Sequence, residues 1–119
     1  MAWSFSSDKL IYMQIADRIT MSVISGNYVP GEQIPSVRQL ALEAAVNPNT
    51  VQHAFAHLEN EGIIVSKGTL GRYVTEDVKV IENCRTQTAK QTVKAFCKTI
   101  NTLGIKKDEI IKMLEEELS

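Results

Sequence analysis

A run of uncharged polar side chains over residues 47–53, NPNTVQH, offers the most specific hydrogen-bonding chemistry in this chain. Asn and Gln can pair bidentately with the major-groove edge of adenine, and Thr and His offer single hydrogen bonds. At helical spacing, four of these side chains would lie on one outer face: Asn49, Thr50, Gln52 and His53. The pattern fits a helix that reads a DNA groove, but an ordinary solvated helix face fits equally well, so this run alone leaves both interpretations open.

No other group of residues in the sequence has the spacing of a catalytic or metal site. His53 and His57 are four residues apart, but the segment HAFAH lacks the glutamate of the HExxH zinc motif and no third ligand follows nearby. Cys84 and Cys97 would lie about 20 Å apart along a single helix, which is beyond the reach of a disulfide. We therefore expect no enzymatic activity, no cofactor and no bound metal.

The size and composition of the chain are those of one folded domain, or of a small domain with an appendage. Of its 119 residues, 44% are hydrophobic and 23% are charged, which excludes a disordered chain and a large two-lobed enzyme. Residues 1–75 hold five basic and six acidic side chains and residues 76–119 hold eight of each, so the positive charge typical of nucleic-acid binders is lacking. No signal peptide or membrane-spanning stretch is recognisable, and we expect a cytoplasmic protein without a membrane partner.

Periodicity and end signals predict that residues 1–75 form a mainly helical domain with a small β-hairpin. Ser36 and Asn47 are good N-cap residues, Pro48 suits the first position of a helix, and Gly62 is expected to be a C-cap. The expected helices cover residues 10–25, 37–44 and 48–61. A β-branched and aromatic run on each side of a basic loop predicts the hairpin, with strands at residues 63–65 and 73–74. Helix, helix, short turn, helix and hairpin is the order of a winged helix-turn-helix.

Residues 76–119 are predicted to form two further helices that mediate dimerisation. The first covers residues 78–103 and the second residues 107–118, separated by a Leu-Gly-Ile sequence that resembles a Schellman stop. Each helix has an apolar stripe that so short a segment cannot bury within one chain, so we expect the stripes to pair across a two-fold axis. The predicted interface residues are Ile81, Val93, Phe96, Ile100, Leu103, Ile110, Ile111, Leu114 and Leu118.

Four segments give the chain a resemblance to a known protein family. They are LIYMQIADRI, SGNYVPGEQIPSVRQLA, VNPNTVQHAFAHLENEGII and GRYV, and they follow one another across residues 10–75. This part of the sequence resembles the DNA-binding domain of the GntR family of bacterial transcription regulators. The NPNTV segment, together with the short helical tail, is similar to the YtrA subfamily. The resemblance implies a winged helix-turn-helix DNA-binding domain in residues 1–75 and a dimerisation region in residues 76–119.

The resemblance also implies which residues touch DNA. In the family, the arginine of the PSVR segment, the start of the recognition helix and the wing make these contacts. The matching positions in this chain are Arg38, Asn47, Asn49, Thr50, Gln52, His53, Lys67, Gly68 and Arg72. The family often has arginine where this chain has Pro48, Gln52 and His53, so we expect weaker attraction to phosphates and a shifted sequence preference. Ala45 stands where the turn commonly has glycine, and we expect mild backbone strain there.

The function that the resemblance implies is that of a homodimeric repressor, which binds a palindromic operator in double-stranded DNA and controls its own operon, often beside transporter genes. Any small-molecule effector is expected between the protomers, next to Phe96 and Cys97. Two alternatives remain open: a winged-helix module that binds another protein, and a DNA-binding drug or lipid sensor with a pocket between the dimer tails. Retention on duplex DNA tests the first alternative, and a ligand screen tests the second.

Overall fold

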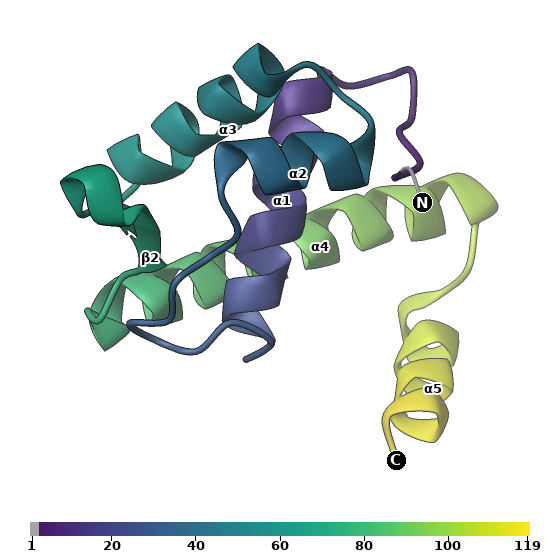
Figure 1. The fold of residues 1–119 in the computed structure, drawn as a ribbon. Helices are drawn as coiled ribbons and strands as arrows, with labels where there is room; N and C mark the ends of the chain where they lie inside the picture. The colour runs from purple at the N-terminus through teal and green to yellow at the C-terminus, as the bar shows by residue number, and fades with distance from the viewer. Residues whose placement is uncertain (1–2) are drawn as a thin grey trace. The chain divides into compact units, whose positions relative to one another are not determined.

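The computed structural model describes residues 3–119, which form two compact units, one ending at Cys84 and the other covering residues 85–119. Figure 1 shows the course of the chain through its helices and its small hairpin. The elements are α1 (Ile11–Ile24), α2 (Val37–Ala44), α3 (Pro48–Asn60), β1 (Ile64–Ser66), the 3-10 turn η1 (Gly68–Leu70), β2 (Arg72–Val74), α4 (Val78–Leu103) and α5 (Lys107–Leu118). The predicted fold class is confirmed: a mainly helical winged helix-turn-helix with a two-stranded hairpin, followed by two C-terminal helices.

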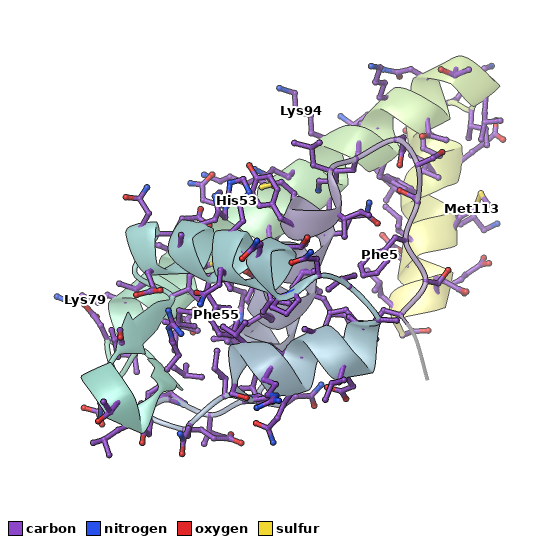
Figure 2. The ribbon with its side chains drawn as sticks, turned by 45° about the horizontal axis from the view of Figure 1, so that its top comes forward. Phe5, His53, Phe55, Lys79, Lys94 and Met113 are labelled. Atoms are coloured by element: carbon purple, nitrogen blue, oxygen red, sulfur yellow. The ribbon has the colours of Figure 1, made fainter. Side chains whose placement is uncertain are left out.

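Helix α3 supplies the central side chains of the first unit's core. Its inner stripe is fully buried, as predicted, and consists of Val51, Ala54, Phe55 and Leu58. Figure 2 shows Phe55 pointing into the unit. The same core cluster includes residues from three neighbouring elements, namely Ile15 and Ile19 of α1, Leu40 of α2 and Ile64 of β1. Because each large apolar side chain buried here stabilises the fold by about 1.5–3 kcal/mol, the stripe fixes the orientation of α3 and leaves its opposite face to the solvent.

Side-chain caps begin both helices of the helix-turn-helix. At α2, Ser36 Oγ accepts from the Gln39 backbone N–H at 3.1 Å, and Gln39 Oε1 accepts from the Ser36 N–H at 2.9 Å, which is a capping box. At α3, Asn47 Oδ1 accepts from the Asn49 N–H at 2.8 Å, and Pro48 occupies the first helical position. Both predicted N-caps are confirmed, so the sequence itself determines where α2 and α3 start.

Ala45 closes α2 in a left-handed backbone conformation, with φ 58° and ψ 50°. Among residues 3–119 it is the only non-glycine residue with a positive φ. Its N–H donates to the Leu42 carbonyl at 3.4 Å, and the Val46 N–H donates to the Ala41 carbonyl at 3.0 Å. Since a Cβ in this conformation approaches the following carbonyl too closely, the backbone strain expected from the missing glycine is present.

The end of α3 differs by one residue from the prediction. The helix ends at Asn60, and its C-cap is Glu61, which still has helical angles of φ −83° and ψ −6°. Gly62 follows with φ 78° and occupies the position after the cap. Gly62 therefore ends the helix in a left-handed conformation, as the prediction of a glycine cap implies, but it lies one position beyond the C-cap residue Glu61.

The wing is a short antiparallel hairpin in which β1 and β2 pair from Ile64 opposite Val74 to Ser66 opposite Arg72. The first strand therefore lies one residue further along the chain than predicted, and the second begins one residue earlier. The turn η1 joins them. Gly71, between η1 and β2, has φ 107°, and a Cβ at this position would lie 2.9 Å from the side-chain nitrogen of Gln33. A larger residue is thus unsuited to this corner of the wing.

Residues 31–34, in the connection between α1 and α2, run beside β2 and hold the wing in place. The Ile34 N–H donates to the Arg72 carbonyl at 3.0 Å, and the Val74 N–H donates to the Glu32 carbonyl at 2.8 Å. Gln33 Nε2 also donates to the Leu70 carbonyl, at 2.7 Å. The start of β2 is therefore fixed by a segment almost 40 residues earlier in the chain.

Helix α4 begins in the first unit and continues in the second. Ile81 is only 7% exposed and belongs to the core of the first unit, and Cys84 packs against that core. The expectation that Ile81 is part of an exposed dimerisation stripe is therefore wrong for the single chain, because the first unit already buries this residue. None of the helices in the described part of the chain combines the length and hydropathy needed to cross a membrane.

The second unit consists of the rest of α4, a turn at Gly104 with φ 72°, and α5. The ranges of both helices and the stop at Gly104 agree with the prediction. No side chain of residues 85–119 is buried, and the most protected apolar residues are half-buried ones near the turn, namely Ile100, Ile105 and Ile110. The second unit therefore has no interior of its own.

Candidate nucleic-acid interface

The N-terminal half of α3 carries the predicted hydrogen-bonding side chains on its outer face. Asn49, Gln52 and His53 are exposed, and Thr50 is half-buried. Figure 2 shows His53 on the side of α3 away from the core. Asn47 is exposed as well, but its side-chain oxygen caps the helix, so its amide N–H groups are what it offers to a ligand. Within about two helical turns, this surface presents several donors and acceptors and no Lys, Arg, Asp or Glu side chain.

A surface hollow of about 580 Å³ borders α3 on one side and is lined by the start of α2 and by β2. Arg38 lies on its wall, is exposed, and forms no ion pair with any other residue of the range 3–119. Burial, with smaller contributions from Glu43 and Glu32, raises the pKa of Tyr28, which also lines this hollow. At neutral pH the hollow therefore contains an uncharged tyrosine and an accessible arginine next to the recognition surface.

Arg72 lies at the start of β2, and its side chain turns towards α3 instead of extending into the solvent. Its Nη2 donates to Gln52 Oε1 at 3.4 Å, and its Nε lies 3.6 Å from Glu59 Oε1. Its guanidinium carbon is 5.2 Å from the centre of the Phe55 ring, and only 28% of the side chain is exposed. The structure thus brings together two of the predicted DNA-contacting residues, Arg72 and Gln52, and adds Glu59, which the sequence did not single out.

Lys67 and Gly68 lie at the outer turn of the wing, and both are exposed. The Lys67 ammonium group is 4.4 Å from the centre of the Tyr73 ring, which is a cation–π contact. Gly68 has φ 63° and begins η1. The wing tip therefore presents one exposed cation, Lys67, next to a glycine whose backbone no side chain covers.

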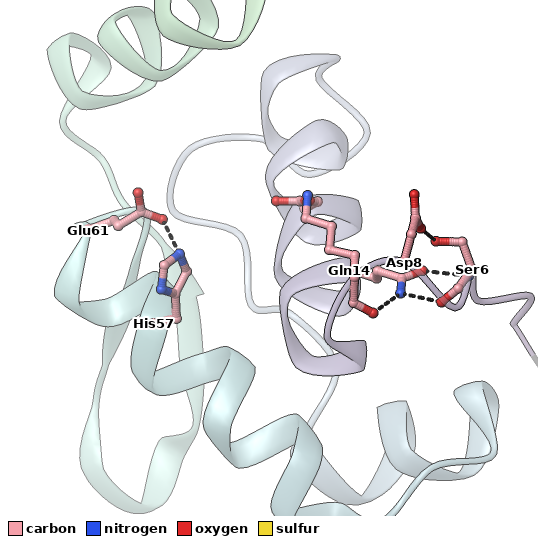
Figure 3. Close-up of polar contacts among 7 residues, drawn as sticks. Ser6, Asp8, Gln14, His57 and Glu61 are labelled. Atoms are coloured by element: carbon pink, nitrogen blue, oxygen red, sulfur yellow. Dashed lines mark hydrogen bonds and ion pairs between the residues drawn. The ribbon is translucent and has the colours of Figure 1, made fainter. Parts of the chain in front are cut away.

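A second hollow, of about 610 Å³, borders α3 on another side, where residues 6–12 run past the recognition helix. Gln14 fastens this N-terminal segment to α1: its Nε2 donates to the carbonyls of Ser6 at 2.9 Å and Lys9 at 2.7 Å, and its Oε1 accepts from the Ser6 N–H at 2.9 Å (Figure 3). The Ser6 hydroxyl donates to Asp8 and lowers the pKa of that carboxyl (Figure 3). The predicted site lacks this segment, because its polar residues have no periodicity that would place them beside α3.

Tyr12 of α1 organises the two histidines of α3. Its ring stacks on His53, with centroids 3.6 Å apart and planes inclined by 9°, and meets His57 edge-on at 6.3 Å. His57 Nε2 in turn lies 3.0 Å from Glu61 Oε1 (Figure 3). Among the described residues, no three His, Cys, Asp or Glu side chains are grouped as a metal site requires. The stacking on Tyr12 restricts the orientation of the His53 ring, which remains exposed to the solvent.

The second unit exposes an apolar surface along α4 and α5. On α4, Val93 is 59% exposed and Phe96 is 37% exposed, with Cys97 exposed beside them. The other exposed members of the predicted stripes are Leu103, Ile111, Leu114 and Leu118. Clusters of large exposed apolar side chains mark surfaces that contact another molecule, so this unit resembles half of an interface.

Comparison with known proteins decides the family. The sequence profile described as "Bacterial regulatory proteins, gntR family" matches residues 11–74, which is more than half of the chain and includes the helix-turn-helix and the wing. The chain belongs to the GntR family of bacterial regulatory proteins. As a GntR protein it is a DNA-binding transcriptional regulator and not an enzyme.

Similarity to GntR proteins also extends over the C-terminal helices. The HTH-type transcriptional regulator YhcF of Bacillus subtilis is 32% identical over 91% of this chain and 89% of its own length. The HTH-type transcriptional repressor YtrA of the same organism is 32% identical over 89% of this chain and 82% of its own. A solved GntR family transcriptional regulator from Listeria monocytogenes is 38% identical, with a TM-score of 0.86 over 94% of this chain and 98% of that chain. The resemblance to the YtrA subfamily is therefore confirmed.

Proposed function

We propose that this GntR regulator is a homodimeric repressor that recognises a palindromic operator and controls its own operon. In this proposal residues 1–75 read DNA, and residues 76–119 form the dimer. The observation that carries it is the polar outer face of the N-terminal half of α3. One hollow borders this face where α2 and the wing lie, and a second hollow borders it where the N-terminal segment lies.

This surface matches the way in which a helix enters DNA. The major groove is about 12 Å wide and is bordered by two phosphate backbones, one on each side of an inserted helix. With α3 in the groove, Asn49 and Gln52 would reach base edges, and the two hollows would receive the backbones. Arg38 lines the first hollow, and Ser6 and Ser7 line the second. Guanidinium and hydroxyl groups are common phosphate contacts, so both sides are chemically suited to this role.

Dimerisation is supported by the second unit, which has exposed apolar side chains on both helices and no buried ones. A stable interface buries on the order of 800 Å² on each partner, which two helices of this length can supply. The proposed contacts are those of the predicted stripes without Ile81, which the first unit buries. Two protomers would then read half-sites about one DNA turn, roughly 34 Å, apart.

A repressing role is supported by the relative YtrA, which is named a transcriptional repressor. Control of the protein's own operon, with transporter genes nearby, is part of the proposal because the resemblance to the YtrA subfamily implies it. An effector would bind between the protomers beside Phe96 and Cys97, since a ligand cavity of a few hundred Å³ needs more walls than two helices of one chain can provide.

Selection of bound fragments from random duplexes with the full-length protein tests the proposal. We expect a palindromic sequence with half-sites one turn apart, a dimer in sedimentation equilibrium, and lower transcription of a reporter placed behind the selected site. A chain that ends after Cys84 keeps the buried Ile81 and serves as the matched control. It should be a folded monomer that binds the palindrome much more weakly.

Four results would contradict parts of this proposal. A full-length monomer at micromolar concentration, or a truncated chain that binds the palindrome as tightly, would exclude the dimerisation role of the tail. Increased reporter transcription would exclude repression. Loss of retention on every duplex, even at low salt, would favour a winged-helix module that binds another protein.

A further inference from the structure

Arg72, at the start of β2, hydrogen-bonds to a side chain of the recognition helix α3, Gln52. We propose that Arg72 is a positioning residue, which sets the orientation of the Gln52 amide for base recognition, and that Glu59 holds Arg72 in place. This inference rests on the proposed function, because it assumes that α3 enters the major groove. It assigns the specificity of one base pair in each half-site to three residues of which only Gln52 reaches DNA.

A hydrogen bond from arginine determines the orientation of a glutamine amide, because the amide oxygen must face the arginine and the amide nitrogen must face away from it. Arginine has only donors, so the Gln52 atom that lies 3.4 Å from Arg72 Nη2 must be the carbonyl oxygen Oε1. The Nε2 donors of Gln52 then occupy the other end of the amide. The terminal torsion of a free glutamine is broad and roughly two-fold, so without Arg72 the exposed amide could present either end. An amide that alternates between donor and acceptor discriminates poorly between base edges.

Three features hold Arg72 in the position that this role requires. Its Nε is buried, makes no hydrogen bond with the described residues, and has the Glu59 carboxylate 3.6 Å away as its charge partner. Its guanidinium carbon lies 5.2 Å from the centre of the ring of Phe55, which is fully buried in the core. Its backbone carbonyl accepts from Ile34 at 3.0 Å. Removing the Glu59 charge would leave a buried N–H without compensation, so the side chain would move out to the solvent.

A role in binding phosphate would require a different arrangement. A phosphate-contacting cation should be exposed and should keep its charge available, as Lys67 does at the wing tip. Arg72 is instead 28% exposed and lies beside a carboxylate that cancels part of its charge. It could reach a phosphate only by leaving both Gln52 and Glu59. The geometry therefore favours positioning over a direct backbone contact.

Four full-length variants test the inference on the selected palindrome, with each base pair of the half-site changed in turn. Gln52→Ala identifies the base pair that Gln52 reads. Arg72→Lys keeps the charge and the aliphatic stem but lacks the planar fork that reaches two partners at once. Glu59→Gln removes the anchoring charge with little change in size. Lys67→Ala is the matched control for a wing cation that touches neither Gln52 nor Glu59.

Gln52→Ala should abolish a preference of about ten- to a hundredfold at one base pair in each half-site. Arg72→Lys should reduce the preference at that same base pair to within about threefold and leave the salt dependence of binding unchanged. Glu59→Gln should reduce the same preference while binding all duplexes somewhat more tightly, because it removes a negative charge. Lys67→Ala should weaken binding evenly across sequences and make the salt slope shallower by about one per protomer.

The inference is overturned if Arg72→Lys keeps the full preference at the base pair that Gln52 reads, or if no base pair responds to Gln52→Ala. It is also overturned if Arg72→Lys mimics Lys67→Ala, with an even loss of affinity across sequences and a shallower salt slope. Circular dichroism checks the fold of each variant, and Glu59→Gln carries the test if Arg72→Lys does not fold. A parent protein that selects no sequence would overturn the proposed function, whereas a normal palindrome with an unaltered Arg72→Lys preference would overturn this inference alone.

Discussion

Replacing Ala45 by glycine should stabilise the first unit, because Ala45 is the only non-glycine residue of the described chain with a positive φ. Its angles, φ 58° and ψ 50°, lie in the middle of the left-handed region. The conformation is imposed by hydrogen bonds of the turn, including the one from the Val46 N–H to the Ala41 carbonyl at 3.0 Å. Ala45 is exposed, so removing its methyl group sacrifices little packing.

The magnitude follows from two opposing terms. A left-handed conformation costs an L-residue about 1–2 kcal/mol relative to glycine. Glycine in turn makes the unfolded chain more flexible, which costs about 0.4–1 kcal/mol. The net gain in the free energy of unfolding should therefore be about 0.5–1 kcal/mol, and the melting temperature of a unit of this size should rise by about 2–8 °C.

Thermal melting followed by circular dichroism measures this change, at one fixed protein concentration because dimerisation would itself raise the apparent stability. Gly62→Ala is the matched control: Gly62 also follows a helix with a positive φ, 78°, and a Cβ there would be 3.9 Å from Val80 Cγ1, an ordinary contact distance. It should lower stability by about 1 kcal/mol for the same reason. A less stable Ala45→Gly variant would refute the reasoning, since chain entropy would then outweigh the left-handed strain.

Two further predictions concern DNA binding and assembly. Asn49→Ala should weaken binding to the selected operator by about 1–3 kcal/mol in fluorescence anisotropy, whereas Asn60→Ala, at the far end of the same helix, should leave it unchanged; equal effects would contradict base recognition by the start of α3. Phe96→Glu should turn the dimer into a monomer in sedimentation equilibrium, while Lys94→Glu, which places a glutamate two residues earlier and therefore on another face of α4, should not. A dimeric Phe96→Glu variant would exclude Phe96 from the interface.

Most of the fold could be predicted because the ends of its helices are marked by capping residues and glycines that are adjacent in the sequence. Ser36 and Asn47 cap the helices that they precede, and Gly104 separates α4 from α5. The predicted β2 begins one residue too late, because residues 31–34 hydrogen-bond to β2 from Arg72 to Val74 and local propensity does not report such a distant contact. Ile81 was misassigned for a related reason: helical periodicity shows that a stripe is apolar but does not identify the surface that covers it.

The candidate site was predictable in its residue types but not in its contacts. Helical periodicity places Asn49 and Gln52 on the outer face of α3, and the structure agrees. The hydrogen bond between Arg72 and Gln52 joins residues 20 positions apart, and no periodicity in the sequence predicts it. Gln14 of α1 ties residues 6–9 to the start of that helix, beside the hollow that α3 borders. Long-range side-chain contacts of this kind decide which predicted residues face a ligand and which support a neighbour.

The same contacts determine how DNA binding should respond to salt. Of the five basic residues before residue 76, two lie beside a carboxylate, Lys9 at Asp17 and Arg72 at Glu59. A third, Arg18, stacks over Trp3 at 4.1 Å and lines a hollow that no residue of α3 borders. Arg38 and Lys67 remain, which gives four cations in a dimer. Since each neutralised phosphate contributes about −0.9 to the slope of log K against log salt concentration, we expect a slope of about −3 to −4. A slope steeper than about −6 in titrations from 50 to 300 mM salt would mean that the internally paired cations release their partners on binding.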